Sequence, residues 1–323
     1  MARPTPQHAI GVDLGGTKTA AGVVTAGGTV LFAETAPTPS REGAPAVIAA
    51  TAGLVRSLLR RAAAEGIVVN EMGIGSAGVI DAAAGVVVSA TDAISGWAGT
   101  PVAAELAERT GLRTTAVNDV HAHALGEAWT GAAAGTSSSL LLAFGTGVGG
   151  SFIDGGRPLL GRHWVAGHAG HIASPYAYDG GTPLPCVCGG AGHVEAIASG
   201  PALHQAYIRL GGSSASDARA VARLAHTGDP VAAHALETAA RCAGQAAGGL
   251  ANMLDPEAII VSGGLAGAGP LWWEAMEAAF RAELMPPLRG LPLRPAALGG
   301  AAAIIGAASL VLRPETVPLE ATL

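Results

Sequence analysis

The chain has 323 residues, a net charge of −6 and 18 lysine and arginine residues, which are scattered along it. This length can bury the cores of two domains, whereas the acidic balance and the lack of a basic run argue against a nucleic-acid partner. Its three cysteines are too few for the disulfide framework of a small secreted protein.

The mean hydropathy of +0.41 comes mostly from alanine. The best candidate for a membrane span, residues 296–312, has internal glycines, no aromatic anchors and no flanking basic cluster, so it predicts a buried helix instead. The amino-terminal stretch MARPTPQHAI lacks the apolar core of a signal peptide. We therefore expect a cytoplasmic protein without a membrane partner.

Predicted strands and helices alternate along the chain, which favours an α/β fold. In chain order, the strands cover residues 8–13, 19–24, 29–34, 72–75, 85–90, 114–117, 138–144, 151–154 and 258–261. The predicted helices cover residues 45–65, 101–110, 120–129, 229–254, 271–284 and 301–312.

One pattern occurs twice. Residues 9–24 and 140–153 each read as a strand, a glycine-rich tip and a second strand. Two such hairpins predict two similar domains, and glycines at the tips let backbone N–H groups approach phosphate oxygens closely. A hairpin without a ligand is the alternative for either loop alone, but the presence of both favours a shared phosphate-binding role.

Both glycine loops resemble other nucleotide motifs at first sight. Gly145, Gly147 and Gly150 fit the dinucleotide fingerprint, but that motif requires a following helix, and residues 151–154 read as a strand. An NAD-dependent oxidoreductase is therefore disfavoured. In the first loop Thr17 precedes Lys18, the reverse of the P-loop order, which excludes a P-loop.

The segment 167–195 holds a candidate metal site. Cys186 and Cys188 lie one residue apart, His193 follows a Gly-Gly-Ala-Gly turn, and His171 lies fifteen positions before the first cysteine. Two thiolates and two imidazoles match the four-ligand set of a structural zinc ion. Two buried free cysteines are the alternative interpretation of the pair.

Four segments together resemble the ROK (repressor, ORF, kinase) family of the actin-like, hexokinase-like ATPase superfamily. DLGGTK at 13–18 and GTGVGG at 145–150 resemble its phosphate motifs, VSGG at 261–264 its adenosine motif, and GHAGH with CVCGGAGHVE its zinc-and-sugar signature. The resemblance implies two actin-like (ribonuclease H-like) ATPase domains with a cleft between them. We expect the smaller domain at residues 1–117 plus the C-terminal helix at about 301–323, and the larger, with the zinc loop, at 118–300.

The resemblance further implies an ATP-dependent sugar kinase that uses Mg²⁺ and holds a structural Zn²⁺. It places the catalytic base at Asp119, with Asn118 orienting a sugar hydroxyl, although an Asn-Asp pair before a helix also fits a simple helix cap. Asp13 is expected to hold Mg²⁺ through water, beside Lys18. His121 and His123, two apart on a helix, are expected to be structural.

The remaining site residues implied by the resemblance fall into three groups. Nucleotide contacts are expected from Asp13, Gly15, Gly16, Thr17, Lys18, Gly145, Thr146, Gly147, Gly263 and Gly264. Sugar contacts are expected from Ser76, Gly78, Asn118, Asp119, His168, His171 and Glu195. The zinc ligands are expected to be His171, Cys186, Cys188 and His193.

Two positions depart from the common family pattern, which has a glutamate where His168 stands and a third cysteine where His193 stands. Bacterial N-acetylmannosamine kinases are similar in the first respect and in carrying EAIASG, found here at 195–200. We therefore expect phosphorylation of the 6-hydroxyl of an N-acylhexosamine, N-acetylmannosamine above all. A glucokinase and a catalytically silent sugar-binding regulator are the alternatives.

Two further expectations concern partners and the metal. A DNA-binding repressor is disfavoured because few residues precede the first phosphate motif. We expect a homodimer or homotetramer, and we expect a small-molecule sugar as the binding partner. Because the phosphate loops lie far from residues 167–195 in the sequence, loss of the metal is expected to weaken sugar binding more than ATP binding.

Overall fold

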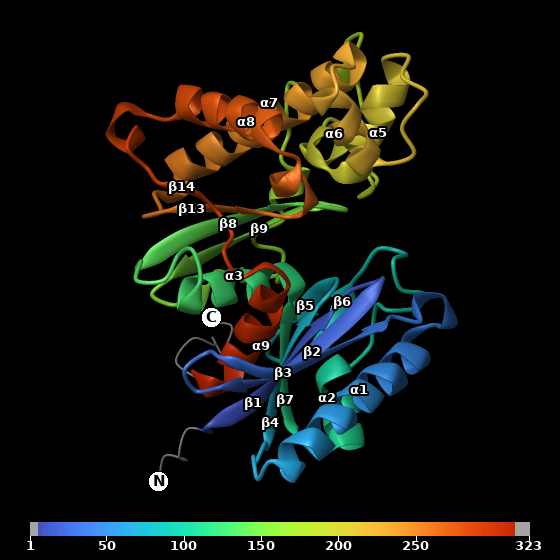
Figure 1. Cartoon of the computed structure of the whole chain (residues 1–323), viewed down its shortest axis with the longest axis vertical. Coiled ribbons are helices and arrows are strands. Elements are labelled where there is room, and N and C mark those ends of the chain that lie inside the picture. The colour runs from blue at the N-terminus through green and yellow to red at the C-terminus, as the bar shows by residue number, and fades with distance from the viewer. Residues whose placement is uncertain (1–5, 314–323) are drawn as a thin grey trace. The chain divides into compact units, whose positions relative to one another are not determined.

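The computed structural model describes residues 6–313, and these residues form two compact units. Within that range, unit 1 comprises residues 6–137, 153–166 and 297–313, and unit 2 comprises residues 138–152 and 167–296. One five-stranded sheet lies wholly in unit 1 and the other mostly in unit 2, each with helices (Figure 1), which confirms the predicted α/β fold. The expected domain boundary between residues 117 and 118 stays a prediction. The compact units differ from it, because residues 118–137 belong to unit 1.

The sheet of unit 1 has the order β3-β2-β1-β4-β7. Its strands are β1 (His8–Leu14), β2 (Lys18–Thr25), β3 (Val30–Pro37), β4 (Glu71–Ser76) and β7 (Arg113–Asn118). The first three pair antiparallel, whereas β4 pairs parallel with both β1 and β7. The carboxyl ends of β1, β4 and β7 therefore meet at one edge, where Leu14 pairs with Ser76 and Ser76 with Asn118.

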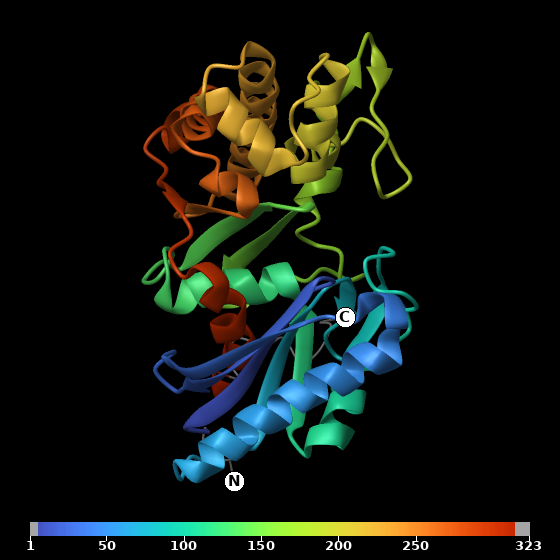
Figure 2. The same cartoon turned by 45° about the vertical axis from the view of Figure 1, so that its right-hand side comes forward.

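Strand alternation assigns the two faces of this sheet. Ile10 and Val12 join the core that the sheet forms with α1 (Ala44–Ala64) and α2 (Val102–Thr110). Figure 2 shows α1 running across that face. The opposite face packs against α3 (Asp119–Thr130) and α9 (Ala302–Leu312).

Glycines bring α9 into backbone contact with its neighbours. A Cβ at Gly11 would lie 1.9 Å from the carbonyl oxygen of Ile304, and one at Gly73 would lie 1.7 Å from that of Ala307. On the helix itself, a Cβ at Gly306 would lie 1.7 Å from the carbonyl oxygen of Ala122 in α3. Any side chain at these three positions would force the elements apart, which explains why an apolar stretch so rich in glycine and alanine forms a core helix.

All of α9 is buried, as expected of its apolar sequence. Among residues 6–313, no helix has both the length and the apolar character that a membrane crossing requires. Unit 1 also contains η1 (Ser40–Glu42), η5 (Gly299–Ala301) and a small two-stranded sheet of β5 (Val79–Asp81) and β6 (Val86–Ser89).

The second sheet has the order β10-β9-β8-β13-β14, which repeats the order of the first when strands are numbered within each sheet. Its strands are β8 (Ser138–Phe144), β9 (Val148–Asp154), β10 (Arg157–Pro158), β13 (Ile259–Ser262) and β14 (Leu293–Pro295). The predicted internal repeat is therefore confirmed. The glycine loop Gly145–Gly147 joins β8 to β9, as the loop after β1 joins β1 to β2.

Helices cover one face of the second sheet in unit 2 (Figure 1). They are α4 (Glu195–Ala198), α5 (Gly200–Arg209), α6 (Ala218–His226), α7 (Pro230–Leu254) and α8 (Pro270–Glu283). Short 3₁₀ segments are η2 (Ala169–His171), η3 (Gly264–Gly267) and η4 (Pro286–Leu288), and β11 (Tyr178–Asp179) pairs with β12 (Thr182–Pro183). Cys242 lies fully buried in this core.

Candidate functional site

In unit 1, the candidate site forms where β7 passes into α3. Asn118 caps α3: its Oδ1 accepts a hydrogen bond from the Val120 N–H at 3.0 Å. Its Nδ2 donates to the Asp119 carboxylate and to the Gly78 carbonyl oxygen, each at 2.9 Å. The two amide hydrogens of Asn118 are thus used in fixing Asp119 and the Gly78 turn, so the residue is a helix cap and a support for Asp119 at once.

The carboxyl group of Asp119 has an unusual proton affinity. Burial raises its pKa to about 6, and the nearby negative charge of Asp13 adds to the rise. Hydrogen bonds from the Val120 N–H and the Asn118 amide act in the opposite direction. Burial also raises the pKa of Asp13, which the Lys18 ammonium group opposes. A carboxylate with a pKa near neutrality can take up a proton at physiological pH, as a general base must.

The first glycine loop is a tight turn braced by a residue that the sequence analysis missed. The Gly15 N–H donates to the Lys18 carbonyl oxygen at 3.1 Å. The Thr38 hydroxyl donates to the Gly15 carbonyl oxygen at 2.8 Å, and its backbone N–H donates to that of Thr17 at 3.0 Å. Thr17 and Lys18 stay exposed at the tip, with Gly16 partly buried.

Ser76 and Gly78 lie near Asn118 but differ in how they could act. Ser76 is fully buried, and its hydroxyl donates to the Ala77 carbonyl oxygen at 3.1 Å. Gly78 has a φ of +96°, and a Cβ there would lie 2.8 Å from the Ser89 carbonyl oxygen. Only glycine fits this turn without strain, so Gly78 shapes the loop whose carbonyl holds Asn118.

In unit 2, two glycine segments far apart in sequence lie side by side. A Cβ at Gly145 would lie 3.9 Å from the Gly264 nitrogen, and one at Gly263, where φ is +90°, would lie 2.3 Å from the Phe144 carbonyl oxygen. The Gly145 N–H donates to the Gly147 carbonyl oxygen at 2.9 Å, which makes the loop containing Thr146 a tight turn. The structure therefore brings the predicted phosphate and adenosine segments of this unit together.

Two aromatic side chains that the sequence analysis missed support the predicted adenosine segment, just after Gly264. His226 of α6 donates from Nε2 to the Ala268 carbonyl oxygen at 2.6 Å, since a carbonyl can only accept. Trp273 of α8 donates from Nε1 to the Ala266 carbonyl oxygen at 2.7 Å. The first contact joins residues 42 positions apart in sequence, and local periodicity carries no signal for such a contact.

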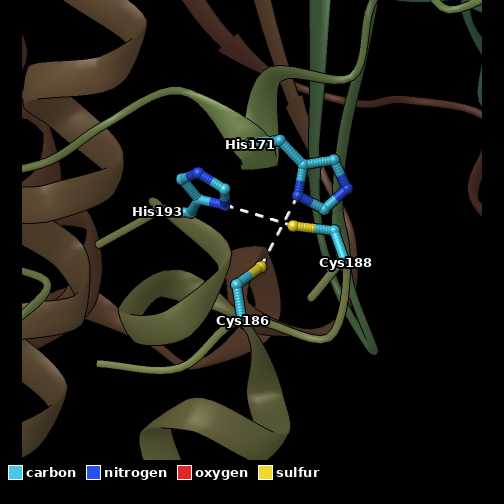
Figure 3. A group of neighbouring side chains, drawn as sticks. All are labelled: His171, Cys186, Cys188 and His193. Carbon is cyan, nitrogen blue, oxygen red and sulfur yellow. Dashed lines mark hydrogen bonds between the residues drawn. The ribbon is translucent and has the colours of Figure 1, made fainter. Parts of the chain in front are cut away.

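The four predicted metal ligands converge (Figure 3). One ligand atom from each of His171, Cys186, Cys188 and His193 lies within 4.8 Å of the others. His171 Nδ1 is 3.6 Å from the Cys186 sulfur, and His193 Nδ1 is 3.3 Å from the Cys188 sulfur. Cys186 and Cys188 sit on a turn closed by the Gly189 N–H, which donates to the Cys186 carbonyl oxygen at 3.0 Å.

This donor set fits the group that the sequence predicts. Two sulfurs and two ring nitrogens within reach of one centre suit a tetrahedral zinc ion. Gly190 must be small, because a Cβ there would lie 2.7 Å from Cε1 of His193. Without a metal, burial raises the pKa of the Cys186 thiol, so a bound cation would stabilise the thiolate.

In the sequence, His168 lies before the four metal ligands and Glu195 lies after them. The His168 ring stacks on that of His171, with centroids 6.1 Å apart and planes at 27°. Glu195 begins α4, and its Oε2 accepts a hydrogen bond from the Val148 N–H at 2.6 Å. A Cβ at Gly147 would lie 2.7 Å from the same oxygen. Glu195, predicted as a sugar contact, is thus also a neighbour of the second glycine loop.

Comparison with known proteins places these features in a family. The ROK family model matches residues 9–314. The glucokinase of Streptomyces coelicolor is 32% identical over 330 residues, covering 95% of this chain and 98% of the relative. The N-acetylmannosamine kinase of Escherichia fergusonii is 30% identical over 255 residues, covering 79% and 82%.

Among solved structures, a ROK family glucokinase from Streptomyces griseus in complex with glucose and AMPPNP is similar, with a TM-score of 0.79 and 33% identity. The match covers 95% of this chain and 99% of that one. The family model spans residues 9–314, which include both glycine loops and the metal cluster. The chain therefore belongs to the ROK family.

Proposed function

We propose that the protein is an ATP-dependent sugar kinase that phosphorylates the 6-hydroxyl of an N-acylhexosamine. The observation that carries this proposal is the Asp119 carboxylate, whose pKa burial raises to about 6 and which Asn118 holds at 2.9 Å. Phosphoryl transfer to a hydroxyl needs a positioned base to take the hydroxyl proton, and Asp119 has the charge, position and pKa for that role.

The nucleotide contacts follow from the glycine loops. Backbone N–H groups of residues 16–18 and 146–147 would hold phosphate oxygens, and Gly263 and Gly264 would lie against the adenosine. The exposed Lys18 adds a positive charge beside the first loop. When bound, Mg²⁺ would neutralise the charge that develops on the phosphate oxygens. Asp13 is the carboxylate of this loop that would hold it, through water.

The metal cluster would serve the fold rather than the transfer step. A kinase needs no open coordination position on a zinc ion, so His171, Cys186, Cys188 and His193 would supply all four ligands. The ion would then fix residues 167–195, which carry the proposed sugar contacts His168 and Glu195.

The choice of N-acetylmannosamine depends on His168. A carboxylate only accepts hydrogen bonds, whereas a neutral imidazole has one donor and one acceptor and can therefore donate to an acetamido carbonyl. Likeness to the N-acetylmannosamine kinase of Escherichia fergusonii supports this choice. Glucokinase is an equal candidate, because likeness to the two Streptomyces glucokinases extends over a larger share of the chain.

A coupled ADP-release assay with a panel of sugars tests these alternatives. We expect the largest kcat/KM for N-acetylmannosamine, ahead of N-acetylglucosamine and glucose, and we expect His168→Glu to shift the preference toward glucose. Highest kcat/KM for glucose in the unmodified enzyme would replace the N-acylhexosamine assignment with glucokinase. Sugar binding without turnover for any sugar would instead indicate a silent sugar-binding regulator.

A further inference from the structure

Residues 167–195 contact the beginning of β9, directly after the second glycine loop, at three points. The Glu195 carboxylate accepts the Val148 N–H at 2.6 Å. The Gly150 N–H donates to the Gly167 carbonyl oxygen at 2.7 Å. A Cβ at Gly170 would lie 2.4 Å from the Val148 carbonyl oxygen, so η2 lies directly against the strand there. Val148 is therefore held on its N–H side and its carbonyl side by one segment.

The metal ligands lie beside these contacts. Gly170 precedes the ligand His171, and Glu195 follows the ligand His193 by two residues. The beginning and the end of the segment, which we call its two arms, also pair with each other. The Val194 N–H donates to the Ile172 carbonyl oxygen at 3.0 Å, and Ala173 forms a β-bridge with His193. A metal ion bound by both histidines would hold these arms together, with Glu195 at the end of one of them.

The contact at Glu195 is the strongest of the three. A hydrogen bond from a backbone N–H to a charged carboxylate is shorter and stronger than one between neutral groups. It orients the peptide group between Gly147 and Val148, which ends the loop that would hold phosphate oxygens. A Cβ at Gly147 would lie 2.7 Å from Oε2 of Glu195, so glycine at this position leaves room for the carboxylate.

We propose that Glu195 is a positioning residue for the Gly145–Gly147 loop, and that metal binding at the His171–His193 cluster raises nucleotide affinity through it. This inference rests on the proposed nucleotide site in that loop. It removes the ground for the expectation that the metal affects sugar binding more than ATP binding, since that expectation rested on distance in the sequence. The reason is that residues 167–195, although distant in sequence, contact Val148 and Gly150.

The experiment measures binding of AMPPNP with Mg²⁺ in the absence of sugar, by calorimetry, so that a role of Glu195 in sugar binding does not contribute. Glu195→Ala is expected to weaken AMPPNP binding roughly tenfold, the range for one charge-assisted hydrogen bond. Glu195→Gln keeps an oxygen acceptor and should lose less. Asp179→Ala, on the exposed β11–β12 hairpin of the same segment, is the matched control and should bind AMPPNP normally.

Metal removal and Glu195→Ala can be combined in a double-perturbation cycle, in which each is tested alone and then both together. Stripping the metal with a chelator, followed by buffer exchange and addition of Mg²⁺, should weaken AMPPNP binding in the unmodified protein. The same treatment should have a smaller additional effect in Glu195→Ala, because contacts in one network are not additive. Hydrogen exchange of the 145–150 amides should become faster in both cases, whereas a role limited to sugar binding would leave it unchanged.

Normal AMPPNP affinity and normal exchange of the 145–150 amides in a folded Glu195→Ala protein would overturn the inference. Full additivity of metal removal and substitution would overturn the link to the metal. If the unmodified protein bound no AMPPNP at all, the proposed kinase function would fail instead, and amide exchange alone would decide the positioning role of Glu195.

Discussion

Asn118 and Asp119 show how one dipeptide can serve structure and chemistry together. Asn118 caps α3 through its Oδ1 and holds the Asp119 carboxylate through its Nδ2. The sequence offered a helix cap and a catalytic pair as alternatives, but the geometry makes them compatible. Because both amide hydrogens of Asn118 are used within the protein, we expect Asn118 to act on a sugar mainly by placing Asp119.

The first prediction concerns Asp119→Asn. The variant keeps size and an oxygen that can accept from Asn118, but it cannot take a proton. We expect kcat to fall by at least about a hundredfold, with a much smaller change in sugar affinity. Steady-state kinetics and calorimetry check this, and a kcat near that of the unmodified protein would leave Asp119 as a structural residue only.

The same substitution should change stability in a pH-dependent way. Asp119 has a folded-state pKa of about 6 against the ordinary aspartate pKa of 3.8, so the folded protein binds this proton more tightly than the unfolded chain does. The contribution to stability is therefore complete below about pH 4 and is lost as the pH rises through 6. We expect Asp119→Asn to raise the melting temperature at pH 7 to 8 and not at pH 4.

The pH dependence of turnover follows from the same group with the opposite preference. A general base must be deprotonated, so kcat/KM for the sugar, which reflects the protein without bound sugar, should fall as the pH drops through about 6, approaching a tenfold loss per pH unit below it. A pH profile of kcat/KM at low sugar concentration measures this acid limb. A limb near pH 4 would mean that the base has an ordinary carboxyl pKa.

Loops rather than helices or strands carry most of the candidate site, and they differ in how far the sequence predicted them. The glycine loops and the metal ligands form short patterns with fixed spacing, so they could be found in the sequence, and the four metal ligands lie together as expected. Most strands and helices, such as β8 and α7, also follow from periodicity, whereas α5 and α6 were missed. The side chains that support the glycine segments could not be predicted, because the hydrogen bonds of Thr38 and His226 join residues that are 23 and 42 positions apart in the sequence.

At the metal loop we expect one zinc ion per chain in protein purified without chelator. Substitution of His193 tests its role as the fourth ligand. Its ring lies close to Gly190, where a Cβ would lie 2.7 Å from Cε1 of the histidine. His193→Cys should retain zinc, because it supplies a thiolate at the same position, whereas His193→Ala should lower the zinc content and the affinity for added zinc. Elemental analysis gives the stoichiometry, and the absorption of a cobalt-substituted protein reports the number of thiolate ligands. Unaltered zinc affinity in His193→Ala would mean that another group is the fourth ligand.

In the protein as a whole, two sheets share one strand order, and α9, the last helix of the described residues, packs against the first sheet. Unit 1 includes residues 297–313, which return to it after all of unit 2. This return is secured by Glu127, a buried residue of α3 that the sequence analysis did not single out. Its Oε1 accepts the Leu298 N–H at 2.9 Å, and its Oε2 accepts those of Ala297 at 3.1 Å and Ala132 at 2.7 Å. One carboxylate thus joins the end of α3 to the segment that leads into α9.

The last prediction tests that connection. Glu127→Gln places an NH₂ group where at least one backbone N–H now finds an oxygen, and a buried donor without an acceptor costs about 1–3 kcal/mol. We expect the free energy of unfolding to fall by that amount in urea titrations. Glu108→Gln, on the exposed side of α2, is the control and should stay within about 0.5 kcal/mol. Because Glu127 lies on α3, whose first residue is Asp119, a loosened helix should also lower kcat more than it raises either KM. Equal unfolding free energies for the two variants would show that the three N–H groups find other acceptors when the carboxylate is gone.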